Sequence, residues 1–323
     1  MHLLARILTL FALTLSAVAP ADAQSWPTRP IKIIVSLAAG GTPDIICRII
    51  SSQLSTSLGQ QVVVENRPGG ANVVGAVAAA RAPADGYTLF FATAAALASN
   101  PHTFKSLPYD PLKDFIAVSM VAKNPFLILA HPSVPATTLP ELIAYDKANP
   151  AKLAFATDGP RNFSGILATW LNKVGGANLL QVPYATMPQG IQDTLAGRTQ
   201  LTILAIPSAA PYIASGALKP LAISWAKRLP QYAQVPSISE SYPGVELTGW
   251  FVIAAPASTP ADIITRLNRE MDKILKTPEM VNRLAKLGFF TDGAETPEAT
   301  QAFVRAQYEL WGKVISEIGL KPE

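Results

Sequence analysis

The regular alternation of strand-like and helix-like segments constrains the fold of this chain more than any other feature. Short β-branched runs, such as Ile31–Val35, alternate with longer segments whose apolar residues have helical spacing, such as residues 44–58. Gly59 follows that helical segment directly and is a typical helix end. The alternation predicts an α/β fold with largely parallel sheets.

The same pattern continues to the end of the chain. Further strands are expected at residues 61–65, 87–92, 152–157, 179–182, 199–205 and 218–224. Further helices are expected at residues 72–81, 139–149, 163–173, 188–196, 262–287 and 297–318. The apolar runs within residues 116–131 and 249–255 are interpreted as two crossings between α/β lobes. We therefore expect lobe 1 at residues 24–124 and 247–323, and lobe 2 at residues 125–246.

The N-terminal residues are interpreted as a secretion signal. Arg6 supplies a short basic start, residues 7–19 form an apolar core, and residues 21–23 (ADA) are a cleavage signal before Gln24. The apolar core is too short for a comfortable membrane span. We therefore expect residues 1–23 to be a cleaved signal peptide and the mature chain to be a soluble exported protein.

Charge and cysteine content exclude some other classes. The formal net charge is +4, but the basic residues are dispersed, which argues against a nucleic-acid partner. Cys47 is the single cysteine, so no intrachain disulfide forms. It lies among apolar residues with helical spacing, and we expect it to be a small buried residue.

Motifs that would indicate an enzyme are missing from the sequence. There is no G-x-S-x-G, no H-E-x-x-H and no phosphate loop ending in G-K-[ST]. No pair of carboxylates is spaced for acid–base work. We therefore expect no catalytic activity, no cofactor and no metal.

The junction between the first strand and the first helix is a candidate ligand-binding loop. Gly40 and Gly41 allow a sharp turn and a close approach of the backbone to a ligand. Thr42 suits the N-cap, Pro43 the first helical position and Asp44 the positive end of the helix. Such a junction leaves unpaired N–H groups aimed at one point, which suits an anion. An ordinary βα turn looks similar, so both interpretations stay open from this segment alone.

Three loops are expected to meet at a cleft between the lobes. They span residues 38–44, 93–99 and 158–164, and each follows the carboxyl end of a predicted strand. Ligands of open α/β sheets bind at that end of the strands.

Several segments taken together resemble one known family. In chain order they are WPTRPI at 26–31, AGG at 39–41 with Asp44, VVENRPG at 63–69, DGYTL at 85–89, NP at 100–101, LPYDP at 107–111 with DF at 114–115, VPY at 182–184, Trp250 and AAP at 254–256. Their shared order and spacing resemble the tripartite tricarboxylate transporter substrate-binding proteins, also called Bug receptors. The resemblance covers nearly the whole mature chain.

The resemblance implies a type II periplasmic-binding-protein fold that acts as a monomer in the bacterial periplasm. Two lobes joined by two crossing strands close over a di- or tricarboxylate or an aromatic acid and present it to a transporter in the inner membrane. The ligand carboxylate is held mainly by backbone N–H groups of two facing loops, which fits an anion nest. The implied ligand-binding residues of these two loops are Ala38, Ala39, Gly40, Gly41, Thr42, Asp44, Thr157, Asp158, Gly159, Arg161, Asn162, Phe163 and Ser164. Thr93 and Ala94 are added because the third loop also follows the carboxyl end of a predicted strand.

The sequence departs from the family pattern in these loops. Ala39 replaces the usual proline of the first loop, and Arg161 and Asn162 replace a glycine and a serine of the second. Ala185 and Thr186 replace a lysine and a glycine after the VPY segment. These departures predict a specificity that has diverged from a generic dicarboxylate.

Four side chains carry hypotheses of their own. Arg161 either grips a second carboxylate of the ligand bidentately, or is a surface arginine, or is neutralised by Asp158. Phe163 either stacks on an aromatic or apolar ligand or belongs to the core of its helix. Tyr184 and Asp193 are further residues expected to face the cleft, with a solvated helix surface as the alternative for Asp193.

The sequence leaves two receptor roles open. A sensor that passes ligand occupancy to a membrane histidine kinase has the same fold as a transport receptor, and only its docking surface differs. A hydrolase-like enzyme is the least supported of the three alternatives.

Overall fold

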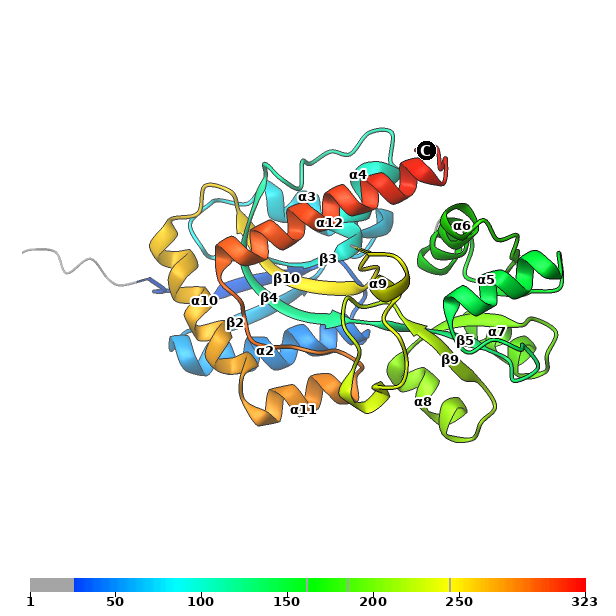
Figure 1. Ribbon diagram of the computed structural model, residues 1–323. Helices are drawn as coiled ribbons and strands as arrows, with labels where there is room; N and C mark the ends of the chain where they lie inside the picture. Colours follow the sequence, from blue (N-terminus) through cyan, green and yellow to red (C-terminus); the bar gives the residue numbers. More distant parts are fainter. Residues whose placement is uncertain (1–25, 161, 185, 244) are drawn as a thin grey trace, which may run out of the picture.

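The computed structural model describes residues 26–160, 162–184, 186–243 and 245–323. The predicted signal peptide, Arg161 and Ala185 therefore lie outside the described residues. The described chain forms two lobes, each built on a five-stranded sheet with helices on both faces (Figure 1). The predicted two-lobed α/β fold is confirmed.

The sheet of lobe 1 has the strand order β2-β1-β3-β10-β4. Its strands are β1 (Ile31–Val35), β2 (Val62–Asn66), β3 (Thr88–Thr93), β4 (Phe115–Asn124) and β10 (Gly249–Pro256). β1 pairs in parallel with β2 and β3, whereas β10 runs antiparallel to both β3 and β4. The expectation of largely parallel sheets is therefore wrong, because the returning strand inserts between two strands of the opposite direction.

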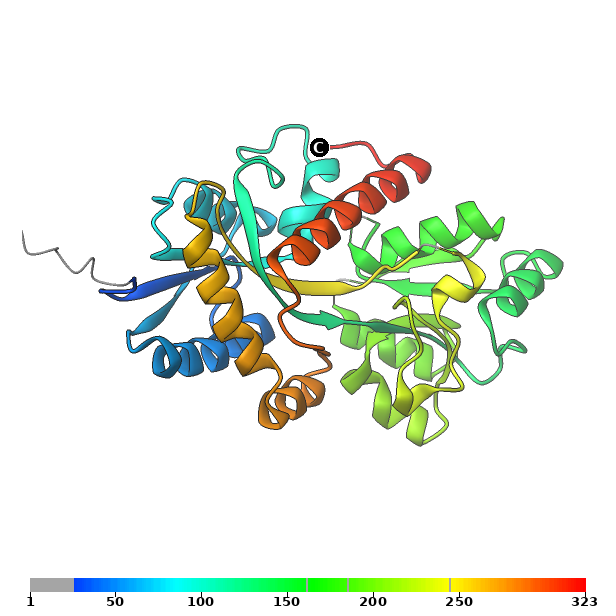
Figure 2. The ribbon, with the colours of Figure 1, turned by 60° about the vertical axis from the view of Figure 1, so that its left-hand side comes forward.

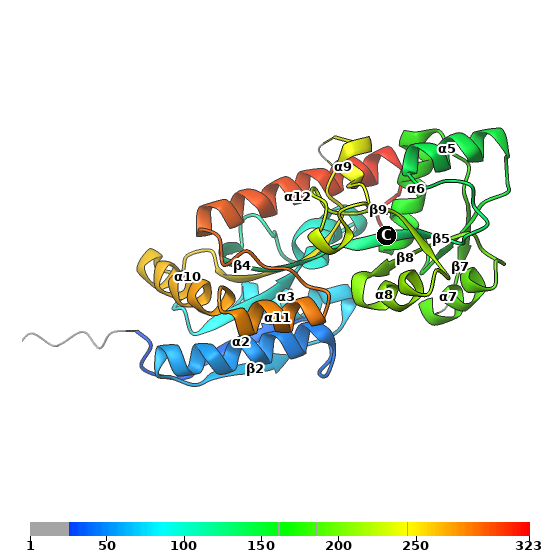
Figure 3. The same cartoon turned by 60° about the horizontal axis from the view of Figure 1, so that its bottom comes forward.

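Helices cover both faces of this sheet. One face carries α2 (Thr42–Leu58), α10 (Ala261–Leu275) and α11 (Pro278–Lys286), which lie together in Figure 3. The other carries α3 (Val73–Ala80), the π-helix η3 (Ala95–Ser99), α4 (Asn100–Thr103) and α12 (Pro297–Glu317). Successive residues of a strand point to opposite faces, so Ile33 enters the first core and Ile34 the second. Burial on both faces explains why these strands are almost uniformly apolar.

The sheet of lobe 2 repeats this plan with the order β7-β6-β8-β5-β9. Its strands are β5 (Phe126–Ala130), β6 (Ala154–Thr157), β7 (Leu180–Pro183), β8 (Leu201–Ala205) and β9 (Lys219–Ile223). Helices α5 (Leu139–Ala148) and α6 (Phe163–Gly175) cover one face, and α7 (Met187–Leu195) and α8 (Ile206–Ala214) cover the other. Three short helices complete the chain, η2 (Gly70–Asn72), η4 (Pro230–Tyr232) and α9 (Ile238–Ser241).

Two crossings and one long helix join the lobes. β4 ends at Asn124 and β5 begins at Phe126, and the chain returns to lobe 1 through β10, as predicted. Helix α12 runs along lobe 1 and reaches lobe 2 (Figure 2). There the rings of Trp311 and Phe163 lie 6.2 Å apart, and Trp170 Nε1 donates to Glu317 at 3.3 Å. The lobes therefore touch through α12 as well as through the crossings.

One local expectation is wrong, and one helix was not predicted. Residues 95–99 form the π-helix η3 instead of a loop, because their small side chains pack into the buried core beneath α12. Helix α8 was not among the expected helices, and it contains Pro211 in its interior. Pro207 stands in the first turn, where no N–H is needed, so the short helix tolerates it.

Two further findings concern the described residues only. None of their helices is both long enough and apolar enough to span a membrane. Cys47 is buried in α2, and this burial raises the pKa of its thiol to about 12, as expected for a small core residue.

Candidate functional site

A cavity of about 570 Å³ lies between the two lobes. Lobe 1 contributes residues that follow β1 and β3, together with Trp250 and Trp311, and lobe 2 contributes Phe126 and the start of α6. Its volume falls in the range of small-molecule sites. The position at the carboxyl ends of β1, β3 and β6 is where an α/β sheet binds ligands.

Aromatic rings form much of the wall. The aromatic residues among the described lining are Phe104, Phe126, Phe163, Trp250, Phe251, Phe289 and Trp311. The last four are buried, whereas Phe104, Phe126 and Phe163 keep part of their surface exposed. Phe126 and Phe163 lie 4.6 Å apart with their planes inclined by 30°. They offer a nearly continuous apolar surface.

Neutral polar groups line the lobe 1 side of the cavity. Ser36 donates to Asn72 Oδ1 at 2.8 Å, and the Asn72 amide nitrogen has no acceptor among the described residues. The hydroxyl of Thr93 accepts from the Ala96 N–H at 3.1 Å and keeps its own proton to donate. The side chain of Ser99 has no partner within the described part of the chain. These groups can donate hydrogen bonds to a ligand without adding charge.

The described lining contains no lysine, arginine or histidine. Glu323 is its one charged member among the described residues. No group of three or more His, Cys, Asp or Glu side chains in the same residues is placed to hold a metal ion. Among the described residues, a ligand anion would therefore be held by hydrogen bonds.

One backbone N–H group that the first loop was expected to offer to a ligand is instead bonded to a side chain of α2. Asp44 Oδ2 accepts from the Gly40 N–H and from Arg48 Nε, both at 2.9 Å, and Oδ1 accepts from Asn66 at 2.9 Å. Burial raises the pKa of Asp44, but these hydrogen bonds outweigh it, and the pKa is lowered. The expectation that the Gly40 amide is unpaired is wrong, because a buried carboxylate needs its donors.

The rest of the first loop stays exposed. The backbone N–H groups of Ala38, Ala39, Gly41 and Thr42 have no acceptor among the described residues. The loop itself is not part of the cavity wall, which it borders through Leu37 and Pro43. The N-cap of α2 is Gly41, which has no side chain to cap the helix, and Thr42 is the first helical residue. The predictions that Thr42 is the N-cap and that Pro43 holds the first helical position are therefore wrong by one residue.

The second loop is bonded within itself. The Asp158 N–H donates to Ser164 Oγ at 2.8 Å, and that hydroxyl donates to the Asp158 carboxylate. Asn162 Nδ2 donates to the Asp158 carbonyl at 2.6 Å. Asn162 and Phe163 line the cavity, whereas Thr157, Asp158, Gly159 and Ser164 do not. Thr157 is fully buried, and its hydroxyl has no partner among the described residues.

Tyr184 and Asp193 are paired with each other outside the cavity wall. The Tyr184 hydroxyl donates to Asp193 Oδ2 at 2.7 Å, and Arg198 Nε donates to Oδ1 at 2.8 Å. The hydrogen bond from Arg198 is the main cause of the lowered pKa of Asp193. Neither Tyr184 nor Asp193 is among the described lining residues, although Thr93 and Ala94 of the predicted set are.

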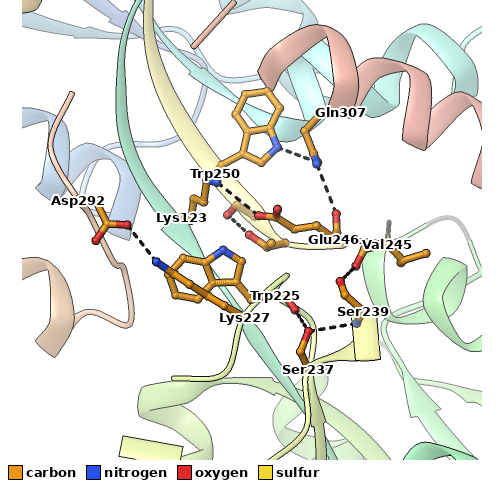
Figure 4. A network of polar contacts seen from close by, with 12 residues as sticks. Lys123, Trp225, Lys227, Ser237, Ser239, Val245, Glu246, Trp250, Asp292 and Gln307 are labelled. Atoms are coloured by element: carbon orange, nitrogen blue, oxygen red, sulfur yellow. Dashed lines mark hydrogen bonds and ion pairs between the residues drawn. The ribbon is translucent and has the colours of Figure 1, made fainter. Parts of the chain in front are cut away.

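The crossings close the cavity on one side and carry a polar network (Figure 4). Lys123 Nζ and Glu246 Oε1 lie 3.5 Å apart, and both side chains are more than four-fifths buried. Gln307 of α12 accepts from Trp250 Nε1 at 3.2 Å and donates to the Glu246 carbonyl at 3.4 Å. The two crossings are thereby tied to each other and to α12.

Sequence reasoning missed much of the wall. Asn72 has a φ of +79°, and this left-handed residue ends a glycine-rich turn, a signal that points to a specialised backbone. Phe126, Trp250 and Trp311 come from three distant elements, and no local pattern brings them together.

Comparison with known proteins decides the family. The model described as the tripartite tricarboxylate transporter family receptor, TctC, matches residues 46–320. The chain belongs to this family. It is accordingly a solute-binding receptor and not an enzyme, as predicted.

Relatives match along nearly the full length of this receptor. Protein BugT of Bordetella pertussis is 34% identical over 317 residues, covering 98% of this chain and 97% of that protein. A structure of R. palustris Rpa4515 with adipate is 32% identical, with a TM-score of 0.72, and covers 92% of this chain and 100% of that one. The periplasmic binding protein BugD is 30% identical, with a TM-score of 0.68 and the same coverage.

Proposed function

We propose that this receptor captures a small carboxylated solute by closing its two lobes and delivers the solute to a tripartite tricarboxylate-type transporter in the inner membrane. The observation that carries the proposal is the cavity lined from both lobes at the carboxyl ends of their strands. A solute that touches both walls favours the closed arrangement through its differential contacts.

The donors around the cavity support a carboxylate as the recognised group. Asn72, Thr93 and Ser99 present neutral hydrogen-bond donors, and the exposed loop that borders the cavity adds free backbone N–H groups at residues 38, 39, 41 and 42. Hydrogen bonds to an ionised acceptor are stronger than those between neutral groups. Two solved relatives contain acids of this kind, one with adipate and one, MatC from Rhodopseudomonas palustris at 27% identity, with malate.

The proposal also covers the cellular location of the receptor and the boundaries of its lobes. We place the receptor in the periplasm, as a monomer released by cleavage after residue 23. The boundaries at residues 124 and 246 agree with the change from one sheet to the other after Asn124 and before β10. Bending at these two points would let the lobes move as bodies.

A thermal-shift screen tests the function. A ligand present at one hundred times its dissociation constant stabilises the folded state by about 2.7 kcal/mol. For a mature chain of about 300 residues that raises the melting temperature by about 4 °C. We expect such a shift with at least one carboxylic acid and none with neutral sugars. A shift with sugars alone would overturn the carboxylate assignment.

A further inference from the structure

Another cavity, of about 240 Å³, lies on the far side of the two crossings. The cavity between the lobes lies beyond the ends of β1 and β3, whereas the wall of this other cavity includes residues 290–293, which run along the outer edge of β4. Phe290 exchanges two backbone hydrogen bonds with Lys123 of β4, each 2.8 Å long. In the sheet order of lobe 1, β10 and β4 therefore stand between these two cavities. We call the smaller cavity the hinge pocket.

Two side chains from each lobe meet in the hinge pocket. Phe290 and Asp292 belong to the segment on the edge of β4, whereas Trp225 and Lys227 follow β9 of lobe 2. The rings of Phe290 and Trp225 lie 5.9 Å apart. Lys227 Nζ lies 3.2 Å from Asp292 Oδ2 (Figure 4) and 4.8 Å from the centre of the Trp225 ring. These four side chains join the two lobes, and we call them the latch.

The latch combines a mostly buried contact with an exposed one. Trp225 is buried in a core cluster of lobe 2, and the ring of Phe290 packs against that cluster from lobe 1. The ion pair is exposed, with 60% of the Lys227 side chain and 78% of the Asp292 side chain accessible, so we expect it to contribute less than the aromatic pair. None of the four residues belongs to the described lining of the cavity between the lobes.

Closure of the lobes separates the two halves of the latch. Because the crossings stand between the two cavities, a rotation about the crossings that narrows the cavity between the lobes widens the hinge pocket. Such a rotation draws Phe290 away from Trp225 and the Asp292 carboxylate away from Lys227. Contacts that exist in only one of two states shift the equilibrium toward that state. The latch contacts therefore favour the open arrangement.

We propose that Trp225, Lys227, Phe290 and Asp292 hold the receptor open and set its affinity for the solute without touching it. The inference rests on the proposed function, because it requires closure on the solute, and it adds the residues that oppose closure. The observed affinity is reduced by the fraction of receptor that is not in the binding-competent state, so loss of the latch should tighten binding. Loss of a residue that only supports the fold would not tighten binding.

A charge reversal at the exposed end of the latch gives the clearest variant. Lys227→Glu faces Asp292 with a like charge, and we expect the ratio of closed to open receptor to rise about 2- to 5-fold. The added negative charge by itself opposes the binding of an anion, so net charge cannot explain tighter binding of an acid. The double variant Lys227→Glu with Asp292→Lys restores opposite charges and should return the ratio to that of the parent.

A second variant removes the aromatic contact. Phe290→Ala deletes one ring of the pair, and we expect the ratio of closed to open receptor to rise about 2- to 12-fold. Lys113→Ala is the matched control, because it breaks an exposed ion pair within lobe 1, between Lys113 and Asp110. This control should leave both the ratio and the affinity unchanged. Since Lys227 is exposed, Lys227→Glu decides the question if Phe290→Ala does not fold.

Distances between two spin labels measure the ratio without any ligand. Labels on Val74→Cys of α3 and Gln189→Cys of α7 stand at exposed positions, one on each lobe. The native thiol of Cys47 is buried and stays unlabelled. In ligand-free Lys227→Glu we expect a larger population of a short distance, the one that the parent reaches on binding an acid.

Titration calorimetry with adipate as the probe completes the test. Latch variants should bind adipate more tightly than the parent, by the factor found for their ligand-free ratio. If the ligand-free distances of Lys227→Glu and the parent are the same, the latch is overturned, and shortening of the distance by adipate in both would leave the proposed function intact. If neither adipate nor any acid of the thermal-shift screen shortens the distance in the parent, the proposed function fails, and the ligand-free comparison still decides the latch.

Discussion

At the scale of single residues, the two glycines of the first loop have different roles although the sequence does not separate them. Gly40 has a φ of +81°, which residues with a side chain rarely adopt. Gly41 has a φ of −73°, and a Cβ there would meet its nearest neighbour, the Ala38 carbonyl, at an ordinary 3.5 Å. Only the first position requires glycine for its backbone conformation.

Alanine substitutions should reveal this difference. Gly40→Ala is expected to lower the free energy of unfolding by about 1–2 kcal/mol, because it forces a left-handed conformation on a residue with a Cβ. Gly41→Ala should change it by less than about 0.5 kcal/mol. Urea denaturation of the two variants beside the parent protein measures both. Equal losses would show that the turn needs both glycines.

Arg161 stays a prediction at this scale, since it lies outside the described residues. If its guanidinium grips a second carboxylate, Arg161→Ala weakens adipate binding far more than hexanoate binding. Titration of both acids against parent and variant provides the comparison. Equal losses of affinity for the two acids would show that Arg161 does not bind a second carboxylate.

At the scale of elements, local sequence patterns predict most strands and helices correctly. They fail for the elements whose conformation depends on packing against distant segments. The β-branched run of β1 and the glycine that ends α2 are local signals, and both predictions hold. The π-helix η3 and the proline-containing α8 form because they fill space against a core built from distant segments. Such tertiary context is invisible in a window of ten residues.

A carboxylate links two helices and makes their packing dependent on pH. Ser57 of α2 donates to Glu270 of α10, and Lys273 Nζ lies 3.0 Å from the same carboxylate. The Ser57 hydrogen bond, with smaller help from Lys273 and Arg269, lowers the pKa of Glu270 from 4.5 to about 2 in spite of burial.

Acid titration of stability tests this link. A lowered pKa in the folded state gives stability that is fully present above about pH 4.5 and is lost as the pH falls toward about 2. Glu270→Gln should therefore be less stable than the parent at pH 6 and should lose less on going from pH 5 to pH 3. Urea midpoints at these pH values measure the change. Parallel losses in parent and variant would contradict the assignment.

The ion pair between the crossings makes a second prediction at this scale. Lys123→Met leaves the mostly buried Glu246 carboxylate without its cation and should cost about 3 kcal/mol. The double variant Lys123→Met with Glu246→Leu should recover most of that loss. A double-mutant cycle by chemical denaturation gives the coupling. Additive losses would show that the two crossings are not energetically tied.

At the scale of the whole molecule, the lobes and crossings follow from the sequence, but the wall of the cavity does not. The alternation of strand and helix patterns occurs once before and once after the first crossing, so the two-lobed α/β fold can be predicted from local patterns alone. The wall combines Phe126, Phe163 and Trp311 from three elements, and their meeting depends on how α12 reaches across to lobe 2. Distances between side chains of separate elements are set by tertiary packing and cannot be predicted from the spacing of residues along the sequence.

Small-angle X-ray scattering on the mature receptor, with and without an acid that raises its melting temperature, tests the central claim most directly. A solute that binds both walls should draw the lobes together, so the radius of gyration should fall on saturation with the acid and stay constant with a neutral sugar. An unchanged radius at saturating acid would contradict capture by closure of the two lobes.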